Sequence, residues 1–425
     1  MAFAFPCDIM VSPSQPKQTD LMNRHFVFIA LVIQILSCRY AAAQGFVPLF
    51  DGKTLDGWEI QSGLAKYHVE DGAIVGTSAK GGPNSFLCTT KDYGDFVLEF
   101  ETKMDPSQNS GVQIRSHRST KDSSILHLQW GPTKLRAGRV YGYQVEIAEE
   151  ESPGSGSIYD ESRHGWLNKV PPTPAAGEAY KDNQWNQYRV VAIGDSIKTW
   201  VNGVPCADIV NPIDQTGFIG LQVHATDSDT PAQVRWRNIR IKDLGRHVWK
   251  PVWGGKTLDG WKQSGGGVWN VENGTIHAHR SDTGDRNGLL ISERSFKDVT
   301  AQLKFRLVKG NSGFFVRADR TTLAGYEVRI DGTKNTGSLY EAGRRKWLAE
   351  PRDHSLLGKD DDWNVLTASM HGHRIVIHVN GVKTVELADD TQGRLKGHLA
   401  LQIDGSSKTD IFFKDIEVLQ PIAPR

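Results

Sequence analysis

The heptapeptide GKTLDGW occurs twice in this chain of 425 residues, at Gly52–Trp58 and again at Gly255–Trp261. Aligning the two occurrences brings further blocks into register, always in the same order, with gaps only between blocks. A period of about two hundred residues is typical of tandem domains rather than of a solenoid. We therefore predict one domain present twice, at residues 45–245 and 247–421. The other matching blocks are NSGVQIRS with NSGFFVRA, GYQVEI with GYEVRI, GSIYDESRHGWL with GSLYEAGRRKWL, and GLQVH with ALQID.

Short segments in which apolar and polar residues alternate occur throughout both copies, for example at 96–104 and 188–194. Alternation with a period of two is typical of strands that bury one face. Asn-Gly and Asp-Gly pairs favour two-residue hairpin turns, and no long amphipathic helix pattern is evident. We therefore expect an all-β fold, with two tandem antiparallel β-sandwich domains. In it, the LDGW segment forms an edge turn with Trp58 or Trp261 packed beneath it.

The first 43 residues follow a different pattern. A basic start at Arg24 precedes an apolar run at 26–37, and three alanines follow that end at Ala43. The run is too short for a transmembrane helix, whereas the whole pattern is typical of a cleaved secretory signal. We expect residues 1–43 to be removed and the protein to be secreted or periplasmic, with no transmembrane segment. A lipid anchor on Cys38 is the alternative, and its flanking residues fit that poorly.

Removal of this signal region would leave Cys88 and Cys206. An exported chain with two cysteines allows one disulfide, and two separate buried thiols are the alternative. The formal net charge of +1 excludes the basic footprint of a nucleic-acid-binding protein. No phosphate-binding loop, GxSxG elbow or zinc motif is present, and no cofactor is evident. Acidic clusters at 149–151, 227–229 and 360–362 are compatible with Ca²⁺, although solvated turns are their commoner use.

The strand alternation places long polar side chains on one face of three strands in the first copy. Because Val112, Val145 and Val223 belong to the apolar face, their neighbours in the chain point the other way. Amides, carboxylates and guanidinium groups are what sugar hydroxyls require, so we predict a carbohydrate-binding face, with an ordinary solvated face as the alternative. The residues on this face are Gln113, Arg115, Gln144, Glu146, Gln222 and His224.

The block GSIYDESRHGWL is too polar and too rich in glycine for a core strand. We predict a loop at the rim of the site, which would supply an aromatic platform and carboxylates. A surface loop that Trp166 merely anchors is the alternative. The candidate residues of this loop are Tyr159, Asp160, Glu161, Arg163, His164 and Trp166.

The second copy keeps the scaffold but changes the polar face. Arg329 replaces Glu146, and Asp404 replaces His224. We therefore expect the second copy to bind something different, to have lost an activity, or to be a packing partner without a ligand. Its candidate substrate-binding residues are Arg317, Glu327, Arg329, Tyr340, Gln402 and Asp404.

The ordered blocks together resemble the 3-keto-disaccharide hydrolase domain family, over nearly all of the mature chain and twice. The resemblance implies a concanavalin A-like jelly roll, export from bacteria and action on carbohydrates. In many members the GYQVEI strand continues into an Asp, whereas Ala148 follows here and Asp331 stands at that place in the second copy.

A ketone at sugar carbon 3 acidifies the hydrogen on carbon 2, so that the glycosidic bond at carbon 1 can break by elimination, followed by addition of water. This reaction needs a base, a cation or donor for the enolate oxygen, and an acid for the leaving group. His224 or Glu146 would be the base. Arg115 would meet the enolate, and Asp160 or Glu161 would serve the leaving group. Conventional hydrolysis by two of these carboxylates is the alternative.

We interpret the chain as a secreted carbohydrate-active protein that acts on glycosidic bonds through its first copy. The rival interpretation is a tandem of non-catalytic glycan-binding modules, since fold alone does not decide function. An enzyme should need both Glu146 and His224, whereas a binding module could lose either one.

Overall fold

The computed structural model describes residues 45–422 except 107, 150–153, 170–173, 285, 333–334 and 352–361. The predicted signal region lies outside the described residues. Among the described residues the only helix is α2 (Pro174–Gly177), and no helix there is long and apolar enough to cross a membrane. No group of three or more metal-ligating side chains occurs in this part of the chain. The acidic clusters at 149–151 and 360–362 are only partly described.

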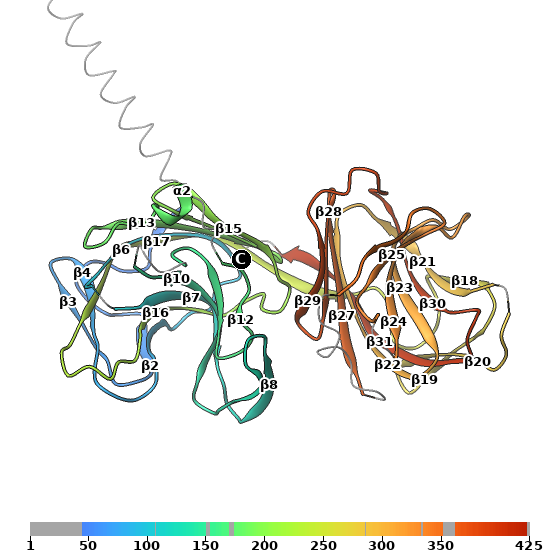
Figure 1. Cartoon of the computed structure of the whole chain (residues 1–425), viewed down its shortest axis with the longest axis horizontal. Coiled ribbons are helices and arrows are strands. Elements are labelled where there is room, and N and C mark those ends of the chain that lie inside the picture. Colours follow the sequence, from blue (N-terminus) through green and yellow to red (C-terminus); the bar gives the residue numbers. More distant parts are fainter. Residues whose placement is uncertain are drawn as a thin grey trace, which may run out of the picture. The chain divides into compact units, whose positions relative to one another are not determined.

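Each copy contains a seven-stranded antiparallel sheet, and the two sheets have the same strand order (Figure 1). The recurrence is the structural counterpart of the repeated sequence blocks. In the first copy the order is β12 (Gly165–Trp166), β11 (Ile158–Glu161), β10 (Val140–Ile147), β7 (Ser110–Arg118), β16 (Phe218–Val223), β5 (Ser85–Thr89) and β2 (Trp58–Ser62). In the second copy it is β26 (Lys346–Ala349), β25 (Leu339–Ala342), β24 (Gly325–Asp331), β23 (Asn311–Ala318), β30 (Gly397–Ile403), β21 (Gly288–Phe296) and β18 (Trp261–Gly265).

The remaining strands form a 15-stranded sheet and one separate hairpin. The junction between the copies lies within a single strand, β17 (Gln233–Pro251), which pairs with β6 of the first copy and with β31 of the second. The other strands of the large sheet are β1 (Val47–Pro48), β3 (Lys66–Glu70), β4 (Ala73–Thr77), β6 (Asp95–Met104), β13 (Asn186–Ile193), β14 (Ser196–Val201), β15 (Val204–Val210), β19 (Val268–Glu272), β20 (Thr275–Arg280), β22 (Val299–Lys309), β27 (Asn364–His371), β28 (Arg374–Val379), β29 (Val382–Leu387) and β31 (Thr409–Ile422). The hairpin is β8 (Ser123–His127) with β9 (Gly131–Leu135).

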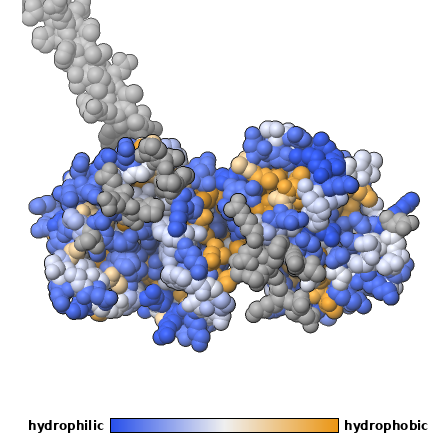
Figure 2. Space-filling model, viewed as in Figure 1, coloured by the Kyte–Doolittle hydropathy of each residue, from blue (hydrophilic) through white to orange (hydrophobic). Residues whose placement is uncertain are grey.

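The core of the first copy lies between its two sheets. Ile114 and Tyr143 enter it from the seven-stranded sheet, and Leu98 enters it from the large sheet. All three side chains are fully buried. A second core of the same kind forms in the second copy, around Leu303 and Val328. The fold is thus all-β with two jelly-roll sandwiches, as the sequence predicts. Apolar side chains are gathered in these cores, and the face of the molecule drawn in Figure 2 is mostly hydrophilic.

The predicted turns are present. Trp58 is 8% exposed beneath the LDGW turn, and its indole Nε1 donates to the Leu49 carbonyl at 2.8 Å. Trp261 is similarly buried. Four two-residue hairpin turns have both central residues at positive φ, which Gly, Asn and Asp tolerate. These turns are Asp71–Gly72, Asn202–Gly203, Asn273–Gly274 and Asn380–Gly381.

The disulfide considered for the two mature cysteines does not form. Cys88 and Cys206 are free and buried. Cys88 packs in a small cluster beside Phe218, whereas Cys206 belongs to the main core of the first copy, so the two sulfurs do not meet. Burial raises the pKa of both thiols.

Candidate functional site

A cavity of about 420 Å³ opens on the polar face of the first copy's seven-stranded sheet. The period of two in β10 produces it: Tyr143, Val145 and Ile147 are fully buried in the core, so the residues between them point into the cavity. Seven of the residues proposed from the sequence line it, from β10, β11, β12 and the end of β16. They are Gln144, Glu146, Tyr159, Glu161, Trp166, Gln222 and His224.

Glu146 is held at the cavity by a chain of side-chain amides. Its Oε1 accepts a hydrogen bond from Asn109 Nδ2 at 2.6 Å, and its Oε2 accepts one from Gln144 Nε2 at 2.8 Å. Gln113, which does not line the cavity, donates to Gln144 Oε1 at 2.7 Å and thereby orients it. Burial raises the pKa of Glu146 to about 7, against the opposing effect of these hydrogen bonds. The group can therefore lose and gain a proton near neutral pH.

A second carboxyl group, Glu161, enters the same cavity from the neighbouring strand β11. It is 6% exposed, its Oε1 accepts from the Ser162 hydroxyl at 3.1 Å, and burial raises its pKa. The negative charge of Glu161 also contributes to the raised pKa of Glu146. Two carboxyl groups in one site thus disfavour double ionisation, and one of them tends to keep its proton.

His224 stands at the exposed rim of the cavity. Its Nδ1 lies 2.7 Å from the Ala225 carbonyl oxygen, which only accepts hydrogen bonds. Nδ1 must therefore carry the hydrogen, so that in the neutral ring Nε2 is an acceptor. Gln222, which is 1% exposed beside it, has neither amide atom hydrogen-bonded to the described residues. A buried amide without partners in a polar cavity is arranged for a ligand that can both donate and accept.

Aromatic rings form the wall of the cavity. Tyr159 and Trp166 meet edge to face with 5.0 Å between ring centroids. Trp130 is 74% exposed and stacks on His127 with centroids 3.9 Å apart. Such a platform suits the apolar face of a sugar ring.

The β8–β9 hairpin and the turn after it bring residues to the cavity that were not predicted from the sequence. A signal was present, because residues 117–141 separate two matched blocks in the first copy, whereas only residues 319–324 separate them in the second. An insertion confined to one copy is a natural place for function. The cavity residues that lie in this insertion are His127, Trp130 and Arg139. Asn84, Asn109 and Ser162, which come from other segments, were not predicted either.

Arg115 does not lie on this face, contrary to the prediction. Its φ of 47° marks a β-bulge in β7, which turns its side chain out of the alternation. The guanidinium is fully buried, donates to the carbonyls of Gly94 at 2.8 Å and Gly194 at 2.6 Å, and pairs with Asp95 at 3.1 Å. Its role is to tie β7 to the opposite sheet.

Arg317, the equivalent residue of the second copy, has the same left-handed backbone conformation and the same kind of hydrogen-bond partners. Its φ is 55°, and it donates to three backbone carbonyls, those of Lys297, Gly372 and Arg394, at 2.9–3.1 Å. The arginine that persists in both copies is therefore part of the fold and not of the cavity.

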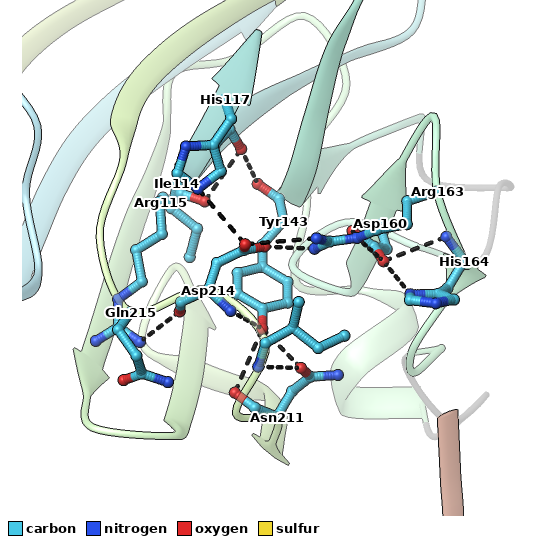
Figure 3. A network of polar contacts seen from close by, with 12 residues as sticks. Ile114, Arg115, His117, Tyr143, Asp160, Arg163, His164, Asn211, Asp214 and Gln215 are labelled. Carbon is cyan, nitrogen blue, oxygen red and sulfur yellow. Dashed lines mark hydrogen bonds and ion pairs between the residues drawn. The ribbon is translucent and has the colours of Figure 1, made fainter. Parts of the chain in front are cut away.

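Asp160, Arg163 and His164 also lie away from the cavity, in a buried polar network (Figure 3). Because Tyr159 and Glu161 face the cavity from β11, Asp160 between them points to the other side. Its Oδ2 accepts from Arg163 Nε at 2.9 Å and from His164 Nδ1 at 2.7 Å, and Arg163 also pairs with Asp214. Contrary to the prediction, these three residues do not line the cavity that contains Glu146 and Glu161.

The second copy retains that network and fills the place of the cavity carboxylate with a cation. Glu341 pairs with Arg345, which pairs in turn with Asp390 at 2.6 Å, as Asp160, Arg163 and Asp214 do in the first copy. Arg329 stands where Glu146 stands, and it pairs with Glu327 at 2.7 Å and with Asp404 at 3.5 Å. The edge-to-face aromatic pair is kept, as Tyr340 with Trp347 and centroids 5.2 Å apart. Gln402 is also retained and is 1% exposed.

A larger cavity, of about 530 Å³, lies elsewhere, beside β1 and β17. Two of its three carboxylates are neutralised: Glu99 pairs with Arg189 and Arg240, and Glu101 pairs with Arg237 at 2.7 Å. The third, Asp51, accepts backbone hydrogen bonds from Lys53 and Thr54 at 2.8 Å. The smaller cavity combines unpaired carboxyl groups, an orphan amide and aromatic walls, so it is the candidate site.

Comparison with known proteins gives the chain's relatives. The model of the 3-keto-alpha-glucoside-1,2-lyase-like domain matches residues 45–242 and again 248–419. A 3-keto-disaccharide hydrolase of Bacteroides thetaiotaomicron is 23% identical over 249 residues, 48% of this chain and 79% of the relative. A carbohydrate-binding module from Bacillus subtilis is 17% identical, with a TM-score of 0.32, over 38% of this chain and 96% of the module. A Bacillus subtilis protein with a galectin-like fold is 14% identical, with a TM-score of 0.33, over 39% of this chain and 92% of its own.

Proposed function

The chain belongs to the family of 3-keto-alpha-glucoside-1,2-lyase-like domains over both of its copies, and from this premise we propose that its first copy cleaves the glycosidic bond of 3-keto-glycosides. The observation that carries the proposal is the buried carboxyl of Glu146, with a pKa of about 7, in one cavity with Glu161 and the rim residue His224. A general base is most effective when its pKa lies near the working pH.

The proposed reaction is an elimination followed by hydration. A base removes the proton on carbon 2, and the electrons of that C–H bond form an enolate with the ketone at carbon 3. Collapse of the enolate expels the glycosidic oxygen from carbon 1, and that oxygen takes a proton from an acid. Water then adds to carbon 1 of the unsaturated ketone while carbon 2 regains a proton. The net change is hydrolysis, with no external oxidant or reductant.

Each role falls to a residue that lines the cavity. Glu146 is the base, because its hydrogen bonds from Asn109 and Gln144 support the carboxylate form. Glu161 is the acid for the leaving oxygen, because it enters the same cavity from β11 and burial raises its pKa. Arg139, which lines the cavity where Arg115 does not, is the cation for the enolate oxygen.

The first experiment measures product release from matched glycosides and 3-keto-glycosides by the full chain. We expect turnover of 3-keto-glycosides only, and a loss of about a hundredfold or more in kcat for Glu146→Gln. The matched control is Glu327→Gln, the change at a carboxylate of the second copy's face, which should leave kcat unchanged. Equal turnover by parent and Glu146→Gln would refute the proposal.

A solvent isotope experiment separates elimination from conventional two-carboxylate hydrolysis. In D₂O the elimination route places deuterium on carbon 2 of the product, since that carbon regains its proton from solvent. Direct displacement at carbon 1 leaves carbon 2 unlabelled. Incubation without enzyme measures the exchange that the ketone undergoes by itself. Turnover of ordinary glycosides without label would establish the hydrolase of the rival mechanism, with the same two carboxyl groups.

A second function, non-catalytic glycan binding, is favoured by one observation in the second copy. Arg329 occupies the place of the base, while the Tyr340–Trp347 pair and the buried Gln402 are retained. A sugar could bind there without reacting. We further propose that the protein acts outside the cytoplasm, which the signal pattern of residues 1–43 supports. N-terminal sequencing of the exported protein tests that proposal, with Gln44 expected as the first residue.

A further inference from the structure

A second cavity, of about 570 Å³, adjoins the candidate site. The two cavities share four lining residues, among them Trp130 and Arg139, so the exposed indole stands at the boundary between them. The β8–β9 hairpin and the turn after it supply most of the second lining. The second copy has only residues 319–324 in place of this insertion, so the hairpin that lines the adjoining cavity is particular to the first copy.

The lining of this adjoining cavity has one sign of charge. Lys134, Arg136 and Arg139 line it, and no Asp or Glu does. None of the three forms an ion pair with a carboxylate of the described residues, unlike the arginines beside Glu99 and Glu101. We call Lys134 and Arg136 the basic annex, because Arg139 is assigned to the enolate oxygen and its charge also acts on Glu161. Two cations in one concave surface, without an ion pair to any carboxylate of the described residues, attract an anionic group and raise its local concentration.

The charges beside the annex determine where an anionic ligand can lie. The candidate site next to it contains Glu146 and Glu161, and carboxyl groups there repel an anion from that cavity. A ligand that fills both cavities therefore has a neutral sugar ring over the carboxyl groups and its anionic group at the annex. The orphan amide of Gln222 fits the hydroxyl groups of the first ring, and the exposed ring of Trp130 at the boundary fits a stacked sugar.

We propose that the basic annex binds a carboxylate or sulfate group on the sugar unit next to the one that is cleaved, so that the substrates are acidic oligosaccharides. This inference rests on the proposed function, which identifies the neighbouring cavity as the place of cleavage. What it adds is the charge of the sugar unit next to the one that is cleaved. A uronic acid and a sulfated sugar share the chemistry that the annex recognises, and the experiment separates them.

The test measures binding of three matched disaccharides to the full chain by calorimetry: a neutral one, its uronic acid counterpart and its 6-sulfate. We expect the parent to bind at least one acidic form about tenfold more tightly, with the preference reduced by salt. The double variant Lys134→Gln/Arg136→Gln should lose the preference while its affinity for the neutral sugar is unchanged. If the parent prefers only one acidic form, that preference shows whether the annex recognises a uronic acid or a sulfated sugar.

The matched control removes two exposed cations from the second copy, as Lys396→Gln/Lys408→Gln, and should keep the preference. Equal affinities in the parent, a preference that survives in the annex variant, or no binding of any of these sugars would each overturn the inference. Failure of the proposed function looks different: the acidic preference persists, but neither parent nor Glu146→Gln releases product. Turnover of neutral and acidic 3-keto substrates with equal kcat/KM would refute the binding role of the annex and would still support the proposed enzymatic activity.

Discussion

The side-chain amide of Gln144 donates a hydrogen bond to the carboxylate of Glu146 at 2.8 Å, two positions along the same face of β10. Gln113 and Ser116 continue the chain of hydrogen bonds behind it, each 2.7 Å long. Gln144 is therefore a positioning residue whose amide stabilises the ionised form of Glu146. Its own effect on the reaction should be visible as a change in pH dependence.

We predict that Gln144→Met moves the acidic limb of the kcat/KM profile to higher pH by roughly one unit. Loss of a hydrogen bond to the carboxylate raises the pKa of Glu146 further above its value of about 7. Profiles between pH 5 and pH 9 measure the shift. Gln222→Met is the control, because that amide lines the cavity without bonding to Glu146, and it should weaken binding without moving the midpoint. An unmoved midpoint in Gln144→Met would contradict the proposed role.

The buried carboxyl also predicts how stability depends on pH. The pKa of Glu146 is raised from 4.5 to about 7 by burial, so the folded state binds that proton more tightly than the unfolded state does. Stability contributed by this group is present below pH 4.5 and is lost as the pH rises through 7. The Glu146→Gln variant should therefore gain about 3 kcal/mol relative to the parent between pH 4.5 and pH 8. Urea unfolding at both pH values measures the difference, and a gap that does not change with pH would refute it.

The fold was predictable because its signals are local. Alternation with a period of two placed Gln144, Glu146 and Gln222 on one face, and the Asn-Gly and Asp-Gly pairs marked the hairpins. The repeat then supplied long-range information, since two copies with the same blocks must have the same strand order.

The parts of the site that could not be predicted depend on geometry that sequence does not carry. The left-handed backbone at Arg115 reverses the alternation at a single residue. The position of Asp160 depends on where β11 begins, and one residue of register decides its face. The contact of His127 with Tyr159, 3.4 Å between Nε2 and the hydroxyl, joins a hairpin to a strand 32 residues away.

Arg115 is predicted to matter for folding and not for chemistry. Arg115→Met should lower the free energy of unfolding by about 3 kcal/mol, because buried carbonyls and Asp95 lose a charged donor. Arg317→Met should cost less, since its partner Asp298 is half exposed and 3.7 Å away. Thermal unfolding compares the two variants. If the Arg115→Met protein were as stable as the parent but had no turnover, Arg115 would have a role in the reaction and not only in folding.

Trp130 offers the clearest separation of binding from stability. The indole is 74% exposed and stacks mainly on His127, so Trp130→Ala should change the melting temperature little. Its removal should weaken glycan binding to the first copy by about 1 kcal/mol, or roughly fivefold, because the stacking surface is lost. Trp347→Ala, at an aromatic residue of the second copy that is 47% exposed, is the matched control. If Trp347→Ala weakens binding and Trp130→Ala does not, the glycan binds the second copy, and the hairpin insertion has another purpose.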